Sequence, residues 1–468
     1  MTQLSNLPGP QGLPLVGNFL QLDINKLHLI LESWADVYGH IYKFTLFHKP
    51  VVVITEPTLI QAILRDRPAN YRRGGSVEQI SREMGTHGVF SAEGEQWQRH
   101  RQLTMQAFRP EHLRNFFPVL QTITGRLKNR WLDQTKAGQT IAVQKDWMRF
   151  SVDVTTNFAF GYDIDLLSGQ EHDNFQRHLE KLLPLFNQRV NAPFPYWRYV
   201  KLPRDRAFEK ALAIINATIQ GFIDQTQQRL AESSANPQAP GNFLETLLLA
   251  RDDNGEPLSA AEIKGNVITL LLAGEDTTAH TLAWMVHLLS QHPEVQANMQ
   301  QEADAVLGAA PYPLDMASLN QLTYIEAVAH ETLRLKSVTP LLFVEPNQDV
   351  DIAGVHIPKG TLLMLASRHG ALQEENFTDA LAFKPERWLA SYPATCAHNR
   401  QANLPFGAGP RFCPGRNLAL LEIKMAMAML CKHFTIGQID NAAPTQEVFS
   451  FTMVPDQVNV AFTLRNAH

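Results

Sequence analysis

Apolar residues recur with a helical period along most of the chain between residues 95 and 335. The pattern is interrupted at Pro118, at Pro184, at 193–203 and at 233–241, where proline and small polar residues break the period. The last of these segments is the best candidate for a flexible loop. The chain therefore predicts a mainly helical protein.

Short segments of a different character lie outside the helical pattern. The runs at 41–46 and 51–55 are rich in β-branched and aromatic residues and predict strands, and residues 350–360 predict a small hairpin. The Pro-rich start, residues 1–20, suits neither a helix nor a central strand, so we expect an extended arm on the surface. The predicted fold class is mainly α with small β-sheets.

A long central helix is predicted over residues 259–292. Ser259 and Glu262 form a capping-box sequence at its start, and Pro293 follows its end. A helix of about 30 residues spans roughly 45 Å, enough to cross a whole domain. Its middle, Val267–Ala273, is apolar on every side, and we expect it to be buried all round.

Two further helices have clear start signals. Ser318 predicts the N-cap of a helix that continues to about Lys336. A final helix should begin just after Pro414 and end near Lys432.

Composition places the chain among ordinary globular proteins. Of 468 residues, 44% are hydrophobic and 19% charged, which supports a large core, and no shift in composition divides residues 1–468, so we expect one domain. The net charge of −5 gives no basic footprint for nucleic acid. The three cysteines, Cys396, Cys413 and Cys431, are too few for a disulfide framework, which favours a reducing compartment. With no signal peptide and no apolar run near the roughly 20 residues that a bilayer needs, we expect a cytoplasmic protein without an integral membrane anchor.

The most informative segment is the loop 406–415, which contains three glycines and two prolines around Cys413. Such a composition predicts a tight, fixed backbone next to the start of the final helix, where a thiolate is favoured. A buried structural cysteine is the usual role of a lone cysteine. A metal cluster is disfavoured, because no second cysteine lies at ligand spacing. The remaining interpretation is a thiolate that binds iron at an open coordination site.

This loop resembles the haem-binding signature of the cytochromes P-450, Phe-x-x-Gly-x-Arg-x-Cys-x-Gly. The residues at its five fixed positions are Phe406, Gly409, Arg411, Cys413 and Gly415. The resemblance implies the single large haem-thiolate fold of that family, with the long helix over a haem b. It makes Cys413 the axial iron ligand, places Phe406 and Gly415 in the cofactor loop and assigns Arg411 to a haem propionate.

Two further arginine motifs fit the same family. Glu331 and Arg334 lie one turn apart on a predicted helix and by themselves predict only a solvated surface pair. The family uses such a pair with a downstream arginine, here Arg387, as a buried structural lock. Trp97 and Arg101 resemble the family's Trp-x-x-x-Arg, which implies propionate contacts.

Other residues near these motifs lead to further expectations. We expect Arg99 and His100 to lie on the surface. Val344 stands where many relatives have another propionate arginine, and Arg368 or His369 are the candidate replacements.

The long helix is interrupted at Gly274–Thr278 by a glycine, acids and hydroxyls. A polar stretch in a buried helix costs stability, so a functional reason is plausible, although Asp276 facing a solvent-filled crevice is the simpler alternative. Gly274 predicts a local opening of the helix. The segment matches the family's oxygen-binding motif, which implies that Asp276 and Thr277 relay protons to bound dioxygen, while Glu275 packs elsewhere or tunes the site.

The resemblance implies a monooxygenase that uses O2 and two electrons to hydroxylate or epoxidise a hydrophobic small molecule: a fatty acid, terpenoid, steroid or aromatic compound. Because only 55 residues follow Cys413, we expect NAD(P)H electrons to arrive through a separate ferredoxin or flavodoxin that docks on Arg411, Lys424 and Lys432 of a monomer. A peroxide-using enzyme or isomerase of the same fold is the first alternative, and a haem carrier or sensor the second. The expected pocket residues, nearly all apolar, are Val89, Phe90, Leu270, Ala273, Leu341, Leu342, Phe343, Phe451, Thr452 and Met453.

Overall fold

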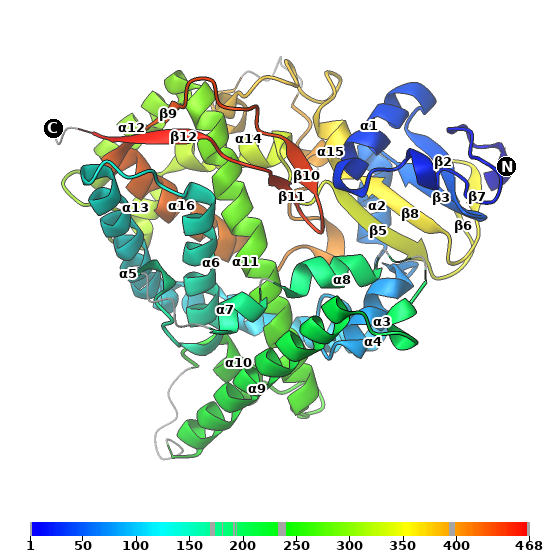
Figure 1. Ribbon diagram of the computed structural model, residues 1–468, viewed down its shortest axis with the longest axis horizontal. Coiled ribbons are helices and arrows are strands. Elements are labelled where there is room, and N and C mark those ends of the chain that lie inside the picture. Colours follow the sequence, from blue (N-terminus) through cyan, green and yellow to red (C-terminus); the bar gives the residue numbers. More distant parts are fainter. Residues whose placement is uncertain are drawn as a thin grey trace. The chain divides into compact units, whose positions relative to one another are not determined.

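The computed structural model describes residues 2–168, 174–179, 181–190, 192, 194–232, 240–392 and 398–465 (Figure 1). The chain forms two compact units, each assembled from separate segments. The first unit comprises Met1–Gly75, Glu326–Cys413 and Ala443–Gln457, and the second comprises Ser76–Ile325, Pro414–Ala442 and Val458–His468. The predicted flexible loop lies mostly outside the described residues. The prediction of one domain stays a prediction.

The first unit is built around a five-stranded sheet with the order β2-β3-β8-β5-β4. Its strands are β2 (Ile41–Leu46), β3 (Lys49–Ile54), β4 (Tyr71–Arg73), β5 (Leu341–Pro346) and β8 (Leu362–Ala366). β3 pairs in parallel with β8, although about three hundred residues separate them, and Figure 1 accordingly colours neighbouring strands blue and yellow. The two predicted N-terminal strands are confirmed.

Two small hairpins accompany this sheet. The predicted hairpin forms from β6 (Val350–Ile352) and β7 (Val355–Ile357), with Ala353 and Gly354 both at positive φ in its turn, as a two-residue hairpin requires. The second hairpin joins β10 (Glu447–Phe449) to β11 (Met453–Pro455).

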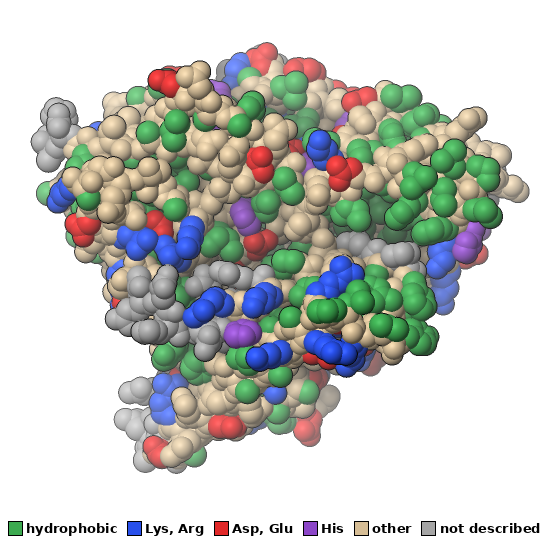
Figure 2. Space-filling view, in the orientation of Figure 1, with side chains coloured by type: hydrophobic (Ala, Val, Ile, Leu, Met, Phe, Trp, Pro, Cys, Tyr) green, Lys and Arg blue, Asp and Glu red, His purple; other side chains and the backbone are tan. Residues whose placement is uncertain are grey.

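The remaining elements of the first unit cover the sheet or run along its edge. The N-terminal arm begins with β1 (Thr2–Gln3), which pairs with β7, and then follows β2, where the Lys43 N–H donates to the Pro8 carbonyl. Several apolar side chains of this region are exposed: Leu13, Leu15, Phe19, Leu20 and Phe47. Figure 2 shows a green area on the right, on the side where Figure 1 draws the N-terminal segments. The helices are α1 (Leu27–Tyr38), α2 (Pro57–Arg65), α15 (Ser367–Ala371) and the 3-10 helices η1 (Leu4–Asn6), η2 (Phe19–Gln21), η3 (Ile24–Lys26), η7 (Pro385–Trp388), η8 (Arg400–Ala402) and η9 (Gly409–Arg411).

The second unit is mostly helical, which confirms the predicted fold class. Its one described sheet pairs β9 (Phe434–Gln438) with β12 (Val460–Leu464). Its helices are α4 (Gly94–Thr104), α5 (Pro110–Lys136), α6 (Val143–Phe160), α7 (Asn174–Leu179), α8 (Leu182–Val190), α9 (Pro203–Glu232), α10 (Phe243–Leu249), α11 (Ala260–Gln291), α12 (Pro293–Leu307), α13 (Met316–Gln321), α16 (Arg416–His433), η4 (Met105–Phe108), η5 (Leu166–Ser168) and η6 (Tyr196–Arg198). α3 (Gly75–Glu83) and α14 (Thr323–Leu335) each begin in one unit and end in the other.

The long central helix α11 begins and ends as predicted. The Ser259 side chain accepts a hydrogen bond from the Glu262 N–H at 3.3 Å, and Glu262 accepts from the Ser259 N–H at 2.8 Å, so the capping box is complete. The expectation that its middle is buried all round is wrong on one side. Val267 and Leu271 are buried, whereas Leu270 is half-buried and Ala273 is exposed.

Two other helix predictions need correction. The helix expected from Ser318 is two helices: Asp315 caps α13 by accepting the Ser318 N–H at 2.7 Å, and α14 follows after Leu322. Ser318 therefore occupies the third helical position. α5 continues through Pro118, because apolar neighbours such as Phe117 and Leu120 are buried and hold the helix in place despite the missing N–H. The final helix, α16, is confirmed.

Candidate functional site

The loop that carries Cys413 is shaped by two glycines. Gly407 and Gly409 have φ values of 70° and 68°, a region that L-residues avoid. A Cβ atom on Gly409 would lie 2.3 Å from the Leu64 carbonyl oxygen of α2, so only glycine lets the loop lie this close to that helix. The Cys413 N–H donates to the Phe406 carbonyl at 2.8 Å and closes the loop. Cys413 is half-buried and lies three residues before α16 begins.

The chemistry of this donor set fits a haem. No group of three or more His, Cys, Asp or Glu side chains within the described ranges could hold a metal ion. Burial raises the pKa of Cys431 to about 12, so that cysteine stays a thiol and is no ligand, and Cys396 lies outside the described residues. A single thiolate can hold iron only if other donors complete the coordination sphere, and a porphyrin supplies four nitrogens. Cys413 suits that arrangement.

The arginine lock is present as a buried network within the first unit. Glu331, Arg334 and Arg387 are fully buried. Glu331 accepts from Arg334 Nη2 at 2.8 Å and from Arg387 Nε at 2.9 Å. It also accepts from the Trp388 indole N–H at 2.8 Å and from the Lys384 N–H at 2.9 Å. The simpler expectation of a solvated surface pair is wrong, because no member of the pair reaches solvent.

On α4, Trp97 is buried and Arg101 is half-buried, one helical turn apart. The expectation that their neighbours lie on the surface is wrong for His100, which is fully buried between Glu262 and Asn266 of α11. Arg99 is only partly exposed and pairs with Asp252 at 2.6 Å and with Glu262 at 2.9 Å. These contacts fasten α4 to the start of α11.

Within the polar interruption of α11, Gly274 has a packing role. A Cβ atom on Gly274 would lie 2.6 Å from Thr155 Oγ1 of α6, so the glycine permits close helix packing. The helix is continuous through this segment, and the predicted opening is wrong. Thr277 Oγ1 donates to the Ala273 carbonyl at 2.7 Å, and Asp276 Oδ1 lies 3.3 Å from His280 Nδ1.

The candidates for a replacement of the missing arginine at Val344 are occupied otherwise. Arg368 gives two hydrogen bonds to Glu32 and one to Glu447, and His369 pairs with Asp36 at 3.0 Å. Val344 itself is fully buried in β5. The prediction that Arg368 or His369 holds a propionate is therefore wrong.

The structure brings the predicted pocket residues of the first unit together. The Met453 N–H donates to the Val338 carbonyl at 2.9 Å, so the turn 451–453 lies beside the segment that leads into β5 with Leu341, Leu342 and Phe343. Phe451, Leu342 and Phe343 are half-buried, whereas Leu341, Thr452 and Met453, which were also expected in the pocket, are buried.

A second pair of predicted pocket segments meets within the second unit. The Val89 N–H donates to Asn266 Oδ1 of α11 at 2.8 Å. Gly88 and Gly265 let the two backbones approach, since a Cβ on Gly265 would lie 2.2 Å from the His87 carbonyl oxygen. Val89 and Phe90 are thus fixed one turn from Leu270. The less buried side of α11 carries Leu270, Ala273 and Thr277 at helical spacing.

The proposed docking residues for a redox partner are only partly available. Lys424 is 5% exposed and cannot contact another protein, so that expectation is wrong. Lys432 pairs with Asp304 at 3.0 Å. Arg411 is half-buried.

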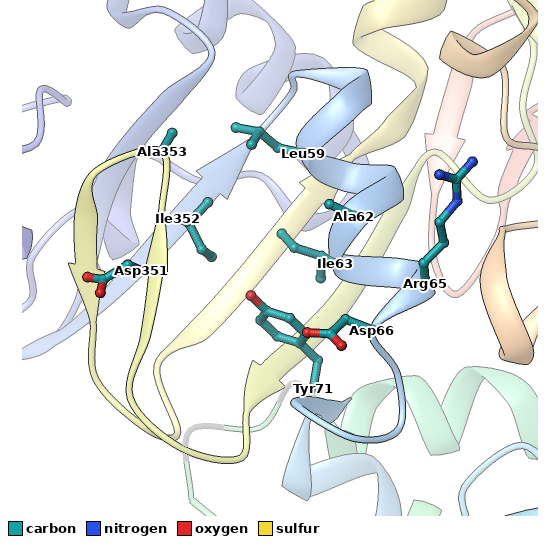
Figure 3. Close-up of a pocket in the computed structure, with 9 residues that line it drawn as sticks. All are labelled: Leu59, Ala62, Ile63, Arg65, Asp66, Tyr71, Asp351, Ile352 and Ala353. Atoms are coloured by element: carbon teal, nitrogen blue, oxygen red, sulfur yellow. The ribbon is translucent and has the colours of Figure 1, made fainter.

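A separate surface cavity of about 420 Å³ lies between α2 and the β6–β7 hairpin (Figure 3). It is lined by Leu59, Ala62, Ile63, Arg65, Asp66, Tyr71, Asp351, Ile352 and Ala353. None of these is a predicted site residue. Among the helices of the described residues, none has both the length and the apolar character for crossing a membrane.

Sequence reasoning missed the residues that act through long-range contacts. Asn266 and Glu447 belong to no motif, and Glu262 was expected only as part of a helix cap. Their partners lie up to 419 residues away along the chain. Trp388, which donates to Glu331, is different, because it directly follows Arg387 in the segment that predicts the buried lock.

Comparisons with known proteins agree with this site. The family profile described as Cytochrome P-450 matches residues 7–462. The chain is 27% identical to 25-hydroxyvitamin D-1 alpha hydroxylase, mitochondrial, of Mus musculus, over 99% of this chain and 94% of that protein. It is 28% identical to Cytochrome P-450 3A12 of Canis lupus familiaris, over 92% of this chain and 85% of that one.

The chain is similar to a crystal structure of a cytochrome P-450 (CYP102L1), with a TM-score of 0.85 over 98% of this chain and 99% of that one. At 24% sequence identity this similarity bears on the fold alone. The profile covers nearly the whole chain and includes the cysteine loop, the buried Glu–Arg–Arg network and the long helix in one continuous match. The chain therefore belongs to the cytochrome P-450 family of haem-thiolate monooxygenases.

Proposed function

We propose that this protein uses O2 and two externally supplied electrons to hydroxylate or epoxidise a hydrophobic small molecule. The observation that carries the proposal is the Cys413 loop, whose glycines and closing hydrogen bond hold a half-buried thiol just before the start of α16. The relative named as a hydroxylase supports the reaction type. The apolar character of the pocket candidates supports a fatty acid, terpenoid, steroid or aromatic substrate.

In this proposal the Cys413 sulfur binds the iron of haem b, and Arg411, Trp97 and Arg101 hold its propionates. The bound haem supplies the redox chemistry that activates dioxygen. The electrons come from NAD(P)H through a separate ferredoxin- or flavodoxin-type protein, for which Arg411 is the remaining candidate contact in the cysteine loop. The cytoplasmic location and the monomeric state stay predictions.

The protein's own contribution to proton supply is assigned to α11. The Asp276 carboxylate lies beside the His280 ring, with Oδ1 3.3 Å from Nδ1. The Thr277 hydroxyl donates to the Ala273 carbonyl, so it is held on the half-buried side of the helix that also carries Leu270. An acid next to a fixed hydroxyl can pass a proton from solvent to the reacting oxygen.

Replacing Thr277 by alanine is expected to lower the yield of product per electron roughly tenfold, because a positioned proton-transfer group contributes about 10²–10⁴-fold and water replaces part of it. The measurement compares product, hydrogen peroxide and consumed NAD(P)H with any apolar substrate that turns over.

The matched control is Thr281→Ala. Thr281 is buried one turn further along and makes the same kind of hydrogen bond, to the Thr277 carbonyl at 2.8 Å. If wild type and Thr277→Ala give the same yield of product per electron, Thr277 takes no part in proton transfer.

A further inference from the structure

A cluster of charged side chains in the first unit lies outside the motifs described above. It consists of Glu32, Lys336, Arg368 and Glu447, together with His28. Arg368 gives Glu32 two hydrogen bonds at 2.7 and 2.9 Å and gives Glu447 one at 2.8 Å. Lys336 Nζ donates to the other Glu447 oxygen at 2.5 Å. Two acids and two bases thus balance one another.

Glu447 is the member with the most partners. Its Oε2 accepts from Arg368 and from His28 Nε2, the latter at 2.9 Å, and its Oε1 accepts from Lys336. Burial by itself would raise the pKa of Glu447, but the His28 hydrogen bond and the charges of Arg368 and Lys336 lower it well below its usual range. The carboxylate is therefore ionised and firmly held. Removing one partner of such a group leaves buried charge without compensation.

Glu447 is also the first residue of the hairpin β10–β11. Each strand has only three residues, with Glu447 opposite Pro455 and Phe449 opposite Met453. A two-stranded hairpin has little stability of its own, so its position depends on contacts outside it.

The described anchors of this hairpin lie at its two ends. At the tip, the Met453 N–H donates to the Val338 carbonyl. At the base stand the ion pairs of Glu447, and the Phe449 ring lies 5.7 Å from that of His28. The tip contact is made by backbone and would survive most substitutions. Besides the buried side chains of Phe449 and Met453, Glu447 ties the hairpin to the rest of the unit through its ion pairs.

We propose that Glu447 is a positioning residue for substrate selection: its ion pairs fix the β10–β11 hairpin and thereby the turn that carries Phe451, the half-buried pocket candidate of this hairpin. This inference rests on the proposed function, in which Phe451 lines the pocket. Glu447 itself touches no substrate and acts only through the hairpin.

The test compares Glu447→Gln with Glu32→Gln in the haem-loaded protein. Both variants remove one carboxylate from the same cluster, but Glu32 belongs to α1 and not to the hairpin. Two probes are titrated and their binding is followed by absorption spectroscopy. Imidazole is too small to contact the side chains of the pocket wall, whereas clotrimazole is a bulky apolar azole that contacts them. Amide hydrogen exchange of residues 447–455 is measured on the same samples.

We expect Glu447→Gln to weaken clotrimazole binding relative to imidazole by roughly 2- to 30-fold, the range over which indirect positioning contacts act. Exchange in the hairpin should rise in the same variant and not in Glu32→Gln. If Glu447→Gln fails to fold, Lys336→Gln takes its place, because Lys336 is partly exposed and its loss removes a single contact of Glu447. A smaller change in the same direction is then expected.

An unchanged ratio of the two affinities, or the same change in Glu32→Gln, would overturn the positioning role even if hairpin exchange rises. Failure of the proposed function looks different: the wild-type holoprotein itself then lacks the carbon monoxide signature of a thiolate ligand. That result would overturn both proposals, whereas a normal wild-type signature with an unchanged ratio overturns only this one.

Discussion

Replacing Glu331 by glutamine is expected to lower the free energy of unfolding by about 3–5 kcal/mol. Glu331 is fully buried and its two oxygens accept from Arg334, Arg387, Trp388 and the Lys384 backbone. The amide nitrogen of glutamine cannot accept, so two buried guanidinium groups lose their counter-charge. A loss of this size removes much of the 5–15 kcal/mol that stabilises a typical domain. Urea unfolding followed by circular dichroism measures it.

The control for this prediction is Glu326→Gln on the same helix. Glu326 is 40% exposed and lies 3.8 Å from His330, a surface pair whose loss should change stability by less than about 0.5 kcal/mol. Equal unfolding free energies for the two variants would show that the buried network contributes no more than an ordinary surface carboxylate.

Gly409→Ala is expected to cost about 2–4 kcal/mol and to reduce the amount of haem that the purified protein retains. The residue has a φ of 68°, which costs an L-residue about 1–2 kcal/mol, and its new Cβ would lie 2.3 Å from the Leu64 carbonyl oxygen. Because that neighbour is backbone of α2, the cysteine loop has to move instead. Haem content per protein and thermal unfolding measure the two effects.

Gly407→Ala separates backbone strain from the steric clash. Gly407 has nearly the same φ, 70°, but nothing lies within 4 Å of an added Cβ. It should cost about 1 kcal/mol and leave haem content close to that of the wild type. If Gly407→Ala and Gly409→Ala behave alike, the contact between the cysteine loop and α2 does not position Cys413.

Features determined by neighbouring residues could be predicted from the sequence. The capping box of α11 depends on residues three positions apart, and the cysteine loop depends on glycines and prolines within ten residues. The less buried side of α11 at Ala273 could not be predicted from its apolar run, because apolar residues line a pocket as readily as a core.

Features determined by distant residues could not be predicted. His100 is buried because Glu262 and Asn266 satisfy its ring nitrogens, and Arg368 is committed to Glu32 and Glu447. No local pattern identifies such partners. Pro118 shows the same limit for helix ends, since the buried face of α5 outweighs the lost hydrogen bond.

The central claim is that Cys413 is the thiolate ligand of a haem. The most direct test is the absorption difference spectrum of the dithionite-reduced protein with and without carbon monoxide, for wild type and Cys413→Ser. The account predicts a strongly red-shifted Soret band in the wild type, produced by electron donation from the thiolate, and its loss in the variant. An unshifted carbon monoxide band in the wild type, or the same red-shifted band in Cys413→Ser, would contradict it.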